Sequence, residues 1–258
     1  MAVQLKGLLF DFDDTLVDWS GVQLAWREIE AARLSRVKDY VWQQSRAYWL
    51  KTDLLLEAYL QDTRAAWSQA RASLRAPHMP SILVNTLKRL GVATESLDVD
   101  EILRAYDWNV VPGAVVFPDV PPMLLVLRQA GIKLGIVTNA SQPMAMRDAE
   151  LAAHGLIEFF PDCRLSAADA GYLKPDRRIF TLALERLGTK PDETVFVGDN
   201  PDADIAGARS VGMKAVLRVS ERAEENGAFT SYQPRLRSLE QLPGILDRWY
   251  PGWRNGSA

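Results

Sequence analysis

The chain alternates between two patterns of apolar positions over most of its length. Continuous apolar runs at residues 5–10, 133–138, 194–197 and 214–219, with a weaker patch at 163–165, are typical of strands buried on both faces. Between them, residues 123–130, 179–187 and 205–211 repeat apolar side chains at helical spacing. A final helix is predicted at 242–249, followed by a disordered tail at 251–258. Strands that alternate with helices predict an α/β fold with a parallel sheet and right-handed crossovers.

Residues 18–112 interrupt this alternation. Val22, Trp26 and Ile29 recur at spacings of four and three, and helical periodicity continues to about residue 106 without a strand pattern. We therefore predict a Rossmann-like parallel-sheet core made of residues 1–17 and 113–258, with an all-helical cap domain inserted at 18–112. Gly21 and Gly113 stand near the two crossings and are candidate hinge residues.

Composition and charge narrow the class of protein. Of the 258 residues, 48% are hydrophobic, which is ample for a sizeable core. The formal net charge is -3, and residues 18–117 contain 12 Lys and Arg against 12 Asp and Glu. This balance argues against nucleic acid or an anionic membrane as a partner, although six of the eight tryptophans lie in that region. The single cysteine, Cys163, the absence of a signal-peptide pattern and the lack of a long apolar stretch predict a cytoplasmic protein without a membrane span.

Polar side chains follow the predicted strands at the points where they end. Asp11, Asp13 and Thr15 come after the first strand, and Thr138 with Asn139 after the second. Asp199 and Asp204 follow the run at 194–197, and Lys174 lies in the loop after the patch at 163–165. Open α/β sheets bind ligands beyond the carboxyl ends of their strands. Since clustered carboxylates repel one another, a hard divalent cation bound through oxygen is the expected partner.

This set of residues resembles the four motifs of the haloacid dehalogenase (HAD) superfamily, and most closely its phosphatase branch with a helical cap after the first motif. Asp11, Asp13 and Thr15 match Asp-x-Asp-x-Thr, Thr138 matches the second motif, Lys174 the third, and Asp199 with Asp204 the fourth. The resemblance covers residues 5–17 and about 113–220. Over the cap it extends only to position and helicity.

The resemblance implies a role for each matched residue. Asp11 would be the nucleophile, and Asp13 the general acid and base. Thr138, Asn139 and Lys174 would bind the phosphate. Asp11, Asp199 and the backbone carbonyl of Asp13 would hold Mg²⁺. Thr15 would brace the loop. Asp204 would either be an outer-shell ligand of the metal or position Lys174. From the residues themselves, Asp14 is predicted to be a turn residue and Asp202 to cap the following helix.

The implied function is that of a Mg²⁺-dependent phosphatase that hydrolyses a small phosphorylated metabolite through an aspartyl-phosphate. Dehalogenases and phosphonate hydrolases of the superfamily lack an acid at the second position, so Asp13 disfavours both. A phosphomutase uses the same acid pair and remains an alternative. A non-catalytic binding protein on this fold predicts a damaged motif, and none is damaged. Most tryptophans of residues 18–112 are expected to serve packing, and their number also suggests a flat ring, such as a nucleobase, as the remote part of the substrate.

Overall fold

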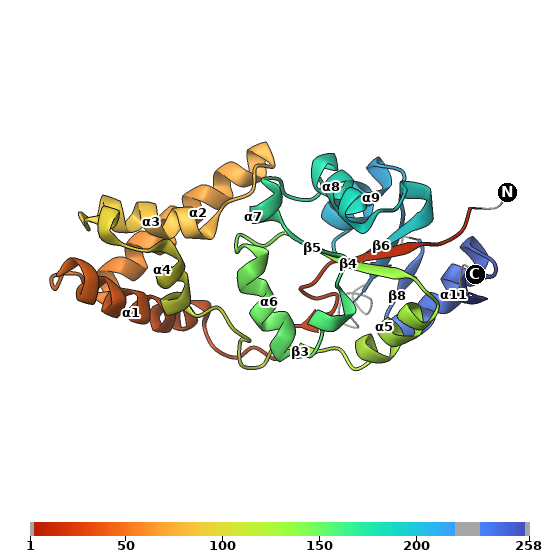
Figure 1. Cartoon of the computed structure of the whole chain (residues 1–258), viewed down its shortest axis with the longest axis horizontal. Helices are drawn as coiled ribbons and strands as arrows, with labels where there is room; N and C mark the ends of the chain where they lie inside the picture. Colours follow the sequence, from red (N-terminus) through yellow and green to blue (C-terminus); the bar gives the residue numbers. More distant parts are fainter. Residues whose placement is uncertain (1–2, 220–232, 256–258) are drawn as a thin grey trace.

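A six-stranded parallel sheet forms one end of the molecule (Figure 1). The computed structural model describes residues 3–219 and 233–255. Along the sheet the strand order is β5-β4-β1-β6-β7-β8. The strands are β1 (Gly7–Phe10), β4 (Lys133–Thr138), β5 (Cys163–Ser166), β6 (Thr194–Gly198), β7 (Lys214–Arg218) and β8 (Arg235–Leu236). The predicted α/β class is therefore confirmed, while β8, only two residues long, was not predicted.

Each face of the sheet is covered by helices and has its own apolar core. On β1, Leu8 and Phe10 pack in one core and Leu9 in the other, which is why the whole strand is apolar. Helices α5 (Val120–Gln129) and α11 (Leu242–Trp249) cover one face, and α8 (Arg177–Leu187) and α9 (Gly207–Ser210) the other (Figure 1). The predicted helix at 205–211 begins earlier, as a π-helical segment, η4 (Pro201–Ala206), that continues into α9.

Short elements complete the sheet region. Two helices, α6 (Met144–Ala153) and α7 (Ala167–Ala170), follow β4 and β5. Single 3₁₀ turns lie at η2 (Ile157–Phe159), η3 (Pro191–Glu193), η5 (Leu239–Gln241) and η6 (Trp253–Asn255), while a further one, η1 (Thr94–Ser96), lies among the helices of residues 18–112. The turn η6 contradicts the predicted disordered tail over 251–255, because the Trp253 ring is buried and its Nε1 donates to Asp247 at 2.8 Å. Residues 256–258 lie outside the described part.

Four helices lie beside the sheet region as a separate group (Figure 1). They are α1 (Trp26–Ser45), α2 (Thr52–Ser73), α3 (Met79–Arg89) and α4 (Val99–Tyr106). An apolar core of their own, with Leu34, Leu83 and Tyr106 fully buried, holds them together. We call residues 18–112 the cap, and its status as a domain remains a proposal. Among the described residues no helix is long and apolar enough to cross a membrane.

Two chain crossings connect the cap to the sheet region. Strands β2 (Val17–Asp18) and β3 (Val115–Val116) pair there as an antiparallel ladder. Next to it Gly113 has a φ of 96°, and a Cβ on this residue would collide with the backbone of Gly21. The two glycines thus allow the crossings to pack directly against each other. Their service as hinges remains a prediction.

Candidate active site

Asp11 lies at the centre of the carboxyl edge of the sheet. Strand β1 is flanked by β4 and β6, and the Asp11 N–H donates to the Val197 carbonyl at 2.9 Å, which extends the ladder by one residue. The carboxylate atom Oδ1 accepts from the Phe12 N–H at 2.7 Å. It also lies 2.8 Å from Nζ of Lys174. These contacts hold the Asp11 side chain in one orientation.

Lys174 is a buried cation with three oxygen atoms close to its Nζ. Besides Asp11, its Nζ lies 2.7 Å from Oδ1 of Asp204 and donates to the Val137 carbonyl at 2.9 Å. Burial alone would lower the pKa of Lys174, but the two carboxylates outweigh it and raise the pKa above its ordinary value. Lys174 is therefore a fixed positive charge at neutral pH. Asp204 contacts Lys174, and both of its predicted roles remain predictions.

Asn139 holds the backbone of Lys174. Its Nδ2 donates to the Lys174 carbonyl at 3.1 Å, and its Oδ1 accepts from the Lys174 N–H at 2.7 Å. The sequence predicts Asn139 to bind phosphate, but its side-chain amide is engaged in this two-way contact. The side chain of Asn139 thus contacts the Lys174 backbone, and its phosphate-binding role stays a prediction.

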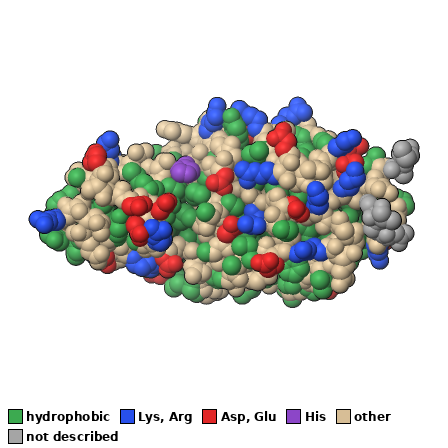
Figure 2. All heavy atoms as spheres, viewed as in Figure 1, with side chains coloured by type: hydrophobic (Ala, Val, Ile, Leu, Met, Phe, Trp, Pro, Cys, Tyr) green, Lys and Arg blue, Asp and Glu red, His purple; other side chains and the backbone are tan. Residues whose placement is uncertain are grey.

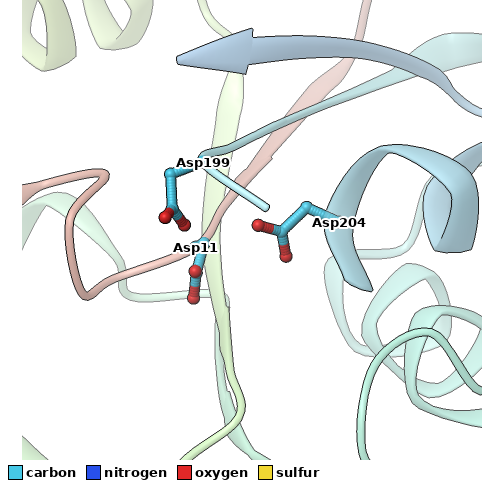
Figure 3. Close-up of side chains that lie close together, drawn as sticks. All are labelled: Asp11, Asp199 and Asp204. Carbon is cyan, nitrogen blue, oxygen red and sulfur yellow. The ribbon is translucent and has the colours of Figure 1, made fainter. Parts of the chain in front are cut away.

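Three carboxylates converge from different elements (Figure 3). Each of Asp11, Asp199 and Asp204 offers an oxygen, and these oxygens lie within 4.8 Å of one another. Burial, together with the neighbouring carboxylates, raises the pKa of Asp11 well above its usual range, although Lys174 opposes the shift. Burial and Asp204 raise the pKa of Asp199 to about 6. Close packing of these carboxylates makes their charged forms unfavourable. A hard divalent cation fits such a set of oxygens because it would offset their repulsion.

The helical segment η4, which follows Asp199, is not capped by the predicted residue, Asp202. The side chain of Asn200, not that of Asp202, caps η4: its Oδ1 accepts from the N–H groups of Asp202 and Ala203 at 3.0 and 2.9 Å. The Asn200 N–H donates in turn to Oδ2 of Asp204 at 3.0 Å. The turn therefore aims the fully buried Asp204 back at Lys174.

Asp13 faces the same site from the loop after β1, and its main partner was not predicted. Its Oδ1 accepts from Nη2 of Arg147 at 2.7 Å, and its Oδ2 accepts from the Thr138 hydroxyl at 3.4 Å. Arg147, on α6, is only 3% exposed. Burial alone would lower its pKa, but Asp13 and Glu150 outweigh this and raise it. The predicted phosphate ligand Thr138 thus lies within reach of Asp13.

Arg147 belongs to no predicted motif. The available signal was its spacing to Glu150: an Arg and a Glu three residues apart, on the face of α6 that also carries the buried Met144 and Leu151. Charged side chains on such a face are rare unless they are paired.

The ion pair of Arg147 continues to the cap. Nε of Arg147 lies 3.2 Å from Oε2 of Glu150, which also accepts from Nε1 of Trp108 at 2.8 Å. Glu150 is fully buried, and burial raises its pKa although Arg147 and Trp108 oppose the shift. Trp108, just beyond α4, is therefore connected to Asp13 through the buried side chains of Glu150 and Arg147.

The two remaining residues of the first motif shape the loop. Asp14 adopts a φ of 56° and its N–H donates to the Val17 carbonyl at 2.8 Å, as expected of a turn residue. Thr15 is fully buried, and its hydroxyl has no hydrogen-bond partner among the described residues. The bracing role of Thr15 stays a prediction.

Two connected cavities open at this edge of the sheet. A cavity of about 220 Å³ is lined by Asp11, Asp13, Thr138, Lys174, Asp199 and Asp204. A second, of about 370 Å³, shares Asp13, Asp14 and Asn139 with it and extends to the cap. A larger hollow of about 540 Å³ around Lys6 and Lys190 contains none of the predicted site residues and lies at the opposite ends of the strands. We therefore place the candidate active site in the first two cavities.

Comparison with known proteins shows the family of the chain. Residues 5–212 match the family model described as haloacid dehalogenase-like hydrolase. The chain belongs to this family. The matched span contains every candidate site residue and the entire cap.

Named relatives of this hydrolase include phosphatases and dehalogenases. It is 34% identical over 232 residues to glyceraldehyde 3-phosphate phosphatase of Methanopyrus kandleri, covering 90% of this chain and 88% of that one. It is 29% identical over 224 residues to phosphoserine phosphatase of Thermus thermophilus, covering 82% and 88%.

Solved structures show the same mixture of activities. A HAD phosphatase from Thermococcus onnurineus superimposes with a TM-score of 0.56 at 28% identity, covering 94% of this chain and 98% of that one. A 2-haloacid dehalogenase from Pseudomonas syringae superimposes with a TM-score of 0.57 at 27% identity, covering 95% and 99%. Fold similarity therefore does not separate the two branches, and the site residues must do so.

Proposed function

We propose that this hydrolase is a Mg²⁺-dependent phosphatase that cleaves a small phosphorylated metabolite through an aspartyl-phosphate on Asp11. The observation that carries the proposal is the pairing of Asp11 with a second carboxyl group, Asp13, at the mouth of one cavity. The phosphatase names of relatives at 34% and 29% identity support the same reaction class. Asp13 also argues against the dehalogenase branch, because a departing halide needs no proton.

In the first step the Asp11 carboxylate attacks phosphorus. A bond forms between an Asp11 oxygen and phosphorus, and the bond from phosphorus to the leaving oxygen breaks. Asp13 delivers a proton to that oxygen, so the metabolite leaves as a neutral alcohol. Thr138 and Lys174 stabilise the negative charge on the phosphoryl group, and Lys174 provides a full positive charge that needs no reorganisation.

In the second step Asp13, now a carboxylate, takes a proton from water. The water oxygen attacks phosphorus, the bond to Asp11 breaks, and inorganic phosphate leaves. Each carboxyl group returns to its starting state. Arg147 holds the Asp13 side chain through both steps by the 2.7 Å contact to Oδ1.

The acidic cluster would hold the cation. The proposed Mg²⁺ ligands are Asp11, Asp199 and the backbone carbonyl of Asp13. Asp204 is not a proposed ligand and forms an ion pair with Lys174. When bound, the cation would neutralise the carboxylates and the phosphoryl oxygens, so that one anion can approach another.

The proposed substrate is small and free in solution. Basic and acidic side chains are interspersed on the face in Figure 2, without the one-sided positive patch that nucleic acid requires. The location in the cytoplasm remains the prediction drawn from the sequence.

A phosphate-release screen over phosphorylated metabolites tests the proposal. We expect release with Mg²⁺, none in excess EDTA, and almost none from Asp11→Asn. Asp148→Asn is the matched control, because Asp148 pairs with Arg164, is half-buried and lines neither cavity. Activity that survives EDTA or Asp11→Asn contradicts the proposal. Transfer of phosphate to a second position of a sugar, in place of release to water, would assign the phosphomutase alternative.

A further inference from the structure

The second cavity carries information about the substrate that the catalytic motifs do not. It continues from the acidic cluster and is lined by four indole rings, those of Trp19, Trp26, Trp67 and Trp108, together with Tyr59. Trp42 and Trp49 do not line it. The indoles are therefore gathered at the place where the remote part of a substrate would lie once its phosphate reached Asp11.

Three of these rings form a continuous series. The centroids of Trp19 and Trp26 are 6.5 Å apart with an interplanar angle of 58°, and those of Trp26 and Trp108 are 6.3 Å apart at 56°. Trp26 is 46% exposed, although it packs between two other indoles. Exposed aromatic surface inside a concave site is surface that a ligand can cover, and aromatic ligands cover it with favourable edge and offset contacts.

Trp108 is held rigidly in this series. Its Nε1 donates to Glu150 at 2.8 Å, and the Arg33 guanidinium lies 4.2 Å from its ring centroid. Both charged residues are buried. Trp108 is itself only 5% exposed. It therefore supports Trp26 from behind, and the more exposed Trp26 ring provides the surface that a flat ligand would contact.

The charges that line the cavity disfavour a second anionic group. Among the described lining residues the only cation is Arg147, and it is engaged by Asp13 and Glu150. Asp13, Asp14 and Glu30 supply three carboxyl groups. Glu30 accepts a hydrogen bond from the Tyr106 hydroxyl at 2.8 Å, so this hydroxyl is not free to donate to a carboxylate of the ligand. A remote carboxylate or second phosphate would therefore face three carboxyl groups and no unengaged cation among the described lining residues, which is costly.

The size of the cavity sets the scale of the remote group. A cavity of about 150 Å³ accepts one benzene ring, whereas this one measures about 370 Å³. A three-carbon chain would leave most of it to water. Two fused rings match the volume more closely.

We propose that the preferred substrate is a phosphomonoester of a flat, uncharged aromatic alcohol with up to two fused rings. This inference rests on the proposed phosphatase function. It separates this hydrolase in specificity from the relatives named for glyceraldehyde 3-phosphate and phosphoserine.

The test compares substrates that differ in flatness and charge. We would measure kcat/KM for 2-(1-naphthyl)ethyl phosphate, its saturated-ring analogue 2-(decahydronaphthalen-1-yl)ethyl phosphate, glyceraldehyde 3-phosphate, O-phosphoserine and acetyl phosphate. The naphthyl ester is expected to exceed the saturated ester and both small metabolites by about tenfold or more, as one or two ring contacts would give. A preference for the saturated ester or for O-phosphoserine overturns the inference.

Two tryptophans of similar exposure provide the matched variants. Trp26→Ala is expected to lower the ratio of naphthyl ester to acetyl phosphate by about tenfold. Trp49, 49% exposed and outside the cavity, is the control, and Trp49→Ala should leave the ratio unchanged. A folded Trp26→Ala variant with the wild-type ratio overturns the inference.

A binding measurement separates this inference from the proposed function. Isothermal titration of the wild-type chain with 2-(1-naphthyl)ethanol should show binding that Trp26→Ala weakens and Trp49→Ala does not. If the alcohol binds in this way but no ester releases phosphate, the phosphatase proposal fails while the aromatic cavity stands. If phosphate is released but the alcohol does not bind, the function stands and the inference fails.

Discussion

Arg147→Met removes the buried cation that joins Asp13 to Glu150. Methionine keeps most of the apolar stem, so the substitution leaves only a small cavity beside Phe12, whose ring lies 4.7 Å from the guanidinium. Removing one partner of a buried ion pair costs about 3–5 kcal/mol, because the other charge remains buried. The Asp13 side chain is 37% exposed and water can solvate it, whereas that of Glu150 is fully buried. We therefore assign most of the lost stability to the unpaired Glu150 and expect the free energy of unfolding to fall by about 3 kcal/mol at neutral pH.

The loss should depend on pH in a defined direction. Burial raises the pKa of Glu150 in the folded chain, and removal of Arg147 would raise it further. A carboxyl group with a raised folded-state pKa adds stability below its unfolded pKa and loses it as pH rises through the folded value. The cost of Arg147→Met should therefore be small near pH 5 and larger near pH 8. Denaturant unfolding followed by tryptophan fluorescence at both pH values measures it.

Two further variants make this prediction refutable. Arg147→Met with Glu150→Gln removes the uncompensated charge and should recover most of the stability at pH 8, but not the activity, because Asp13 still lacks its partner. Arg164→Met is the control: its pair with Asp148 leaves both side chains about a quarter exposed and should cost about 1 kcal/mol or less. If the Arg147 and Arg164 variants lose equal stability, or if the double variant recovers none, the assigned role of the buried pair is wrong.

Three other outcomes follow from the site and the crossings. Asp13→Ala should slow hydrolysis of alkyl phosphates far more than that of p-nitrophenyl phosphate, whose leaving group needs no proton; equal losses would exclude the acid role. Because burial and Asp204 raise the pKa of Asp199 to about 6, the metal-free chain should lose stability as pH rises through that value. Mg²⁺ should therefore raise Tm more at pH 7.5 than at pH 5, and a larger rise at pH 5 would contradict the ligand assignment. Gly113→Ala should lower stability by about 1–3 kcal/mol, since it combines a positive φ with a collision against Gly21; an unchanged denaturation midpoint would refute the packing argument.

The sequence predicted the parts of the site that lie at strand ends. Asp11, Lys174, Asp199 and Asp204 come together because parallel strands bring their carboxyl ends to one edge, and the apolar runs that locate those strands are visible in the sequence. The helical character of the cap was visible for a similar reason, because helical periodicity is local.

Contacts between distant segments could not be predicted in this way. Arg147 reaches Asp13 from 134 positions away, and Trp108 reaches Glu150 from 42 positions away. Neither contact has a periodic or motif signal, since both depend on how α6 packs between the sheet and the cap. The engaged amide of Asn139 is a similar case, because the sequence shows the residue type but not its partner.

The central claim is that Asp11 accepts the phosphoryl group. Incubation with Mg²⁺ and acetyl phosphate, a rapid acid quench and borohydride reduction would convert an aspartyl-phosphate to homoserine, which peptide mass spectrometry locates. The account predicts homoserine at position 11 in the wild-type chain and none in Asp11→Asn. Homoserine at position 13 or 199, or phosphate release without any labelled residue, would contradict it.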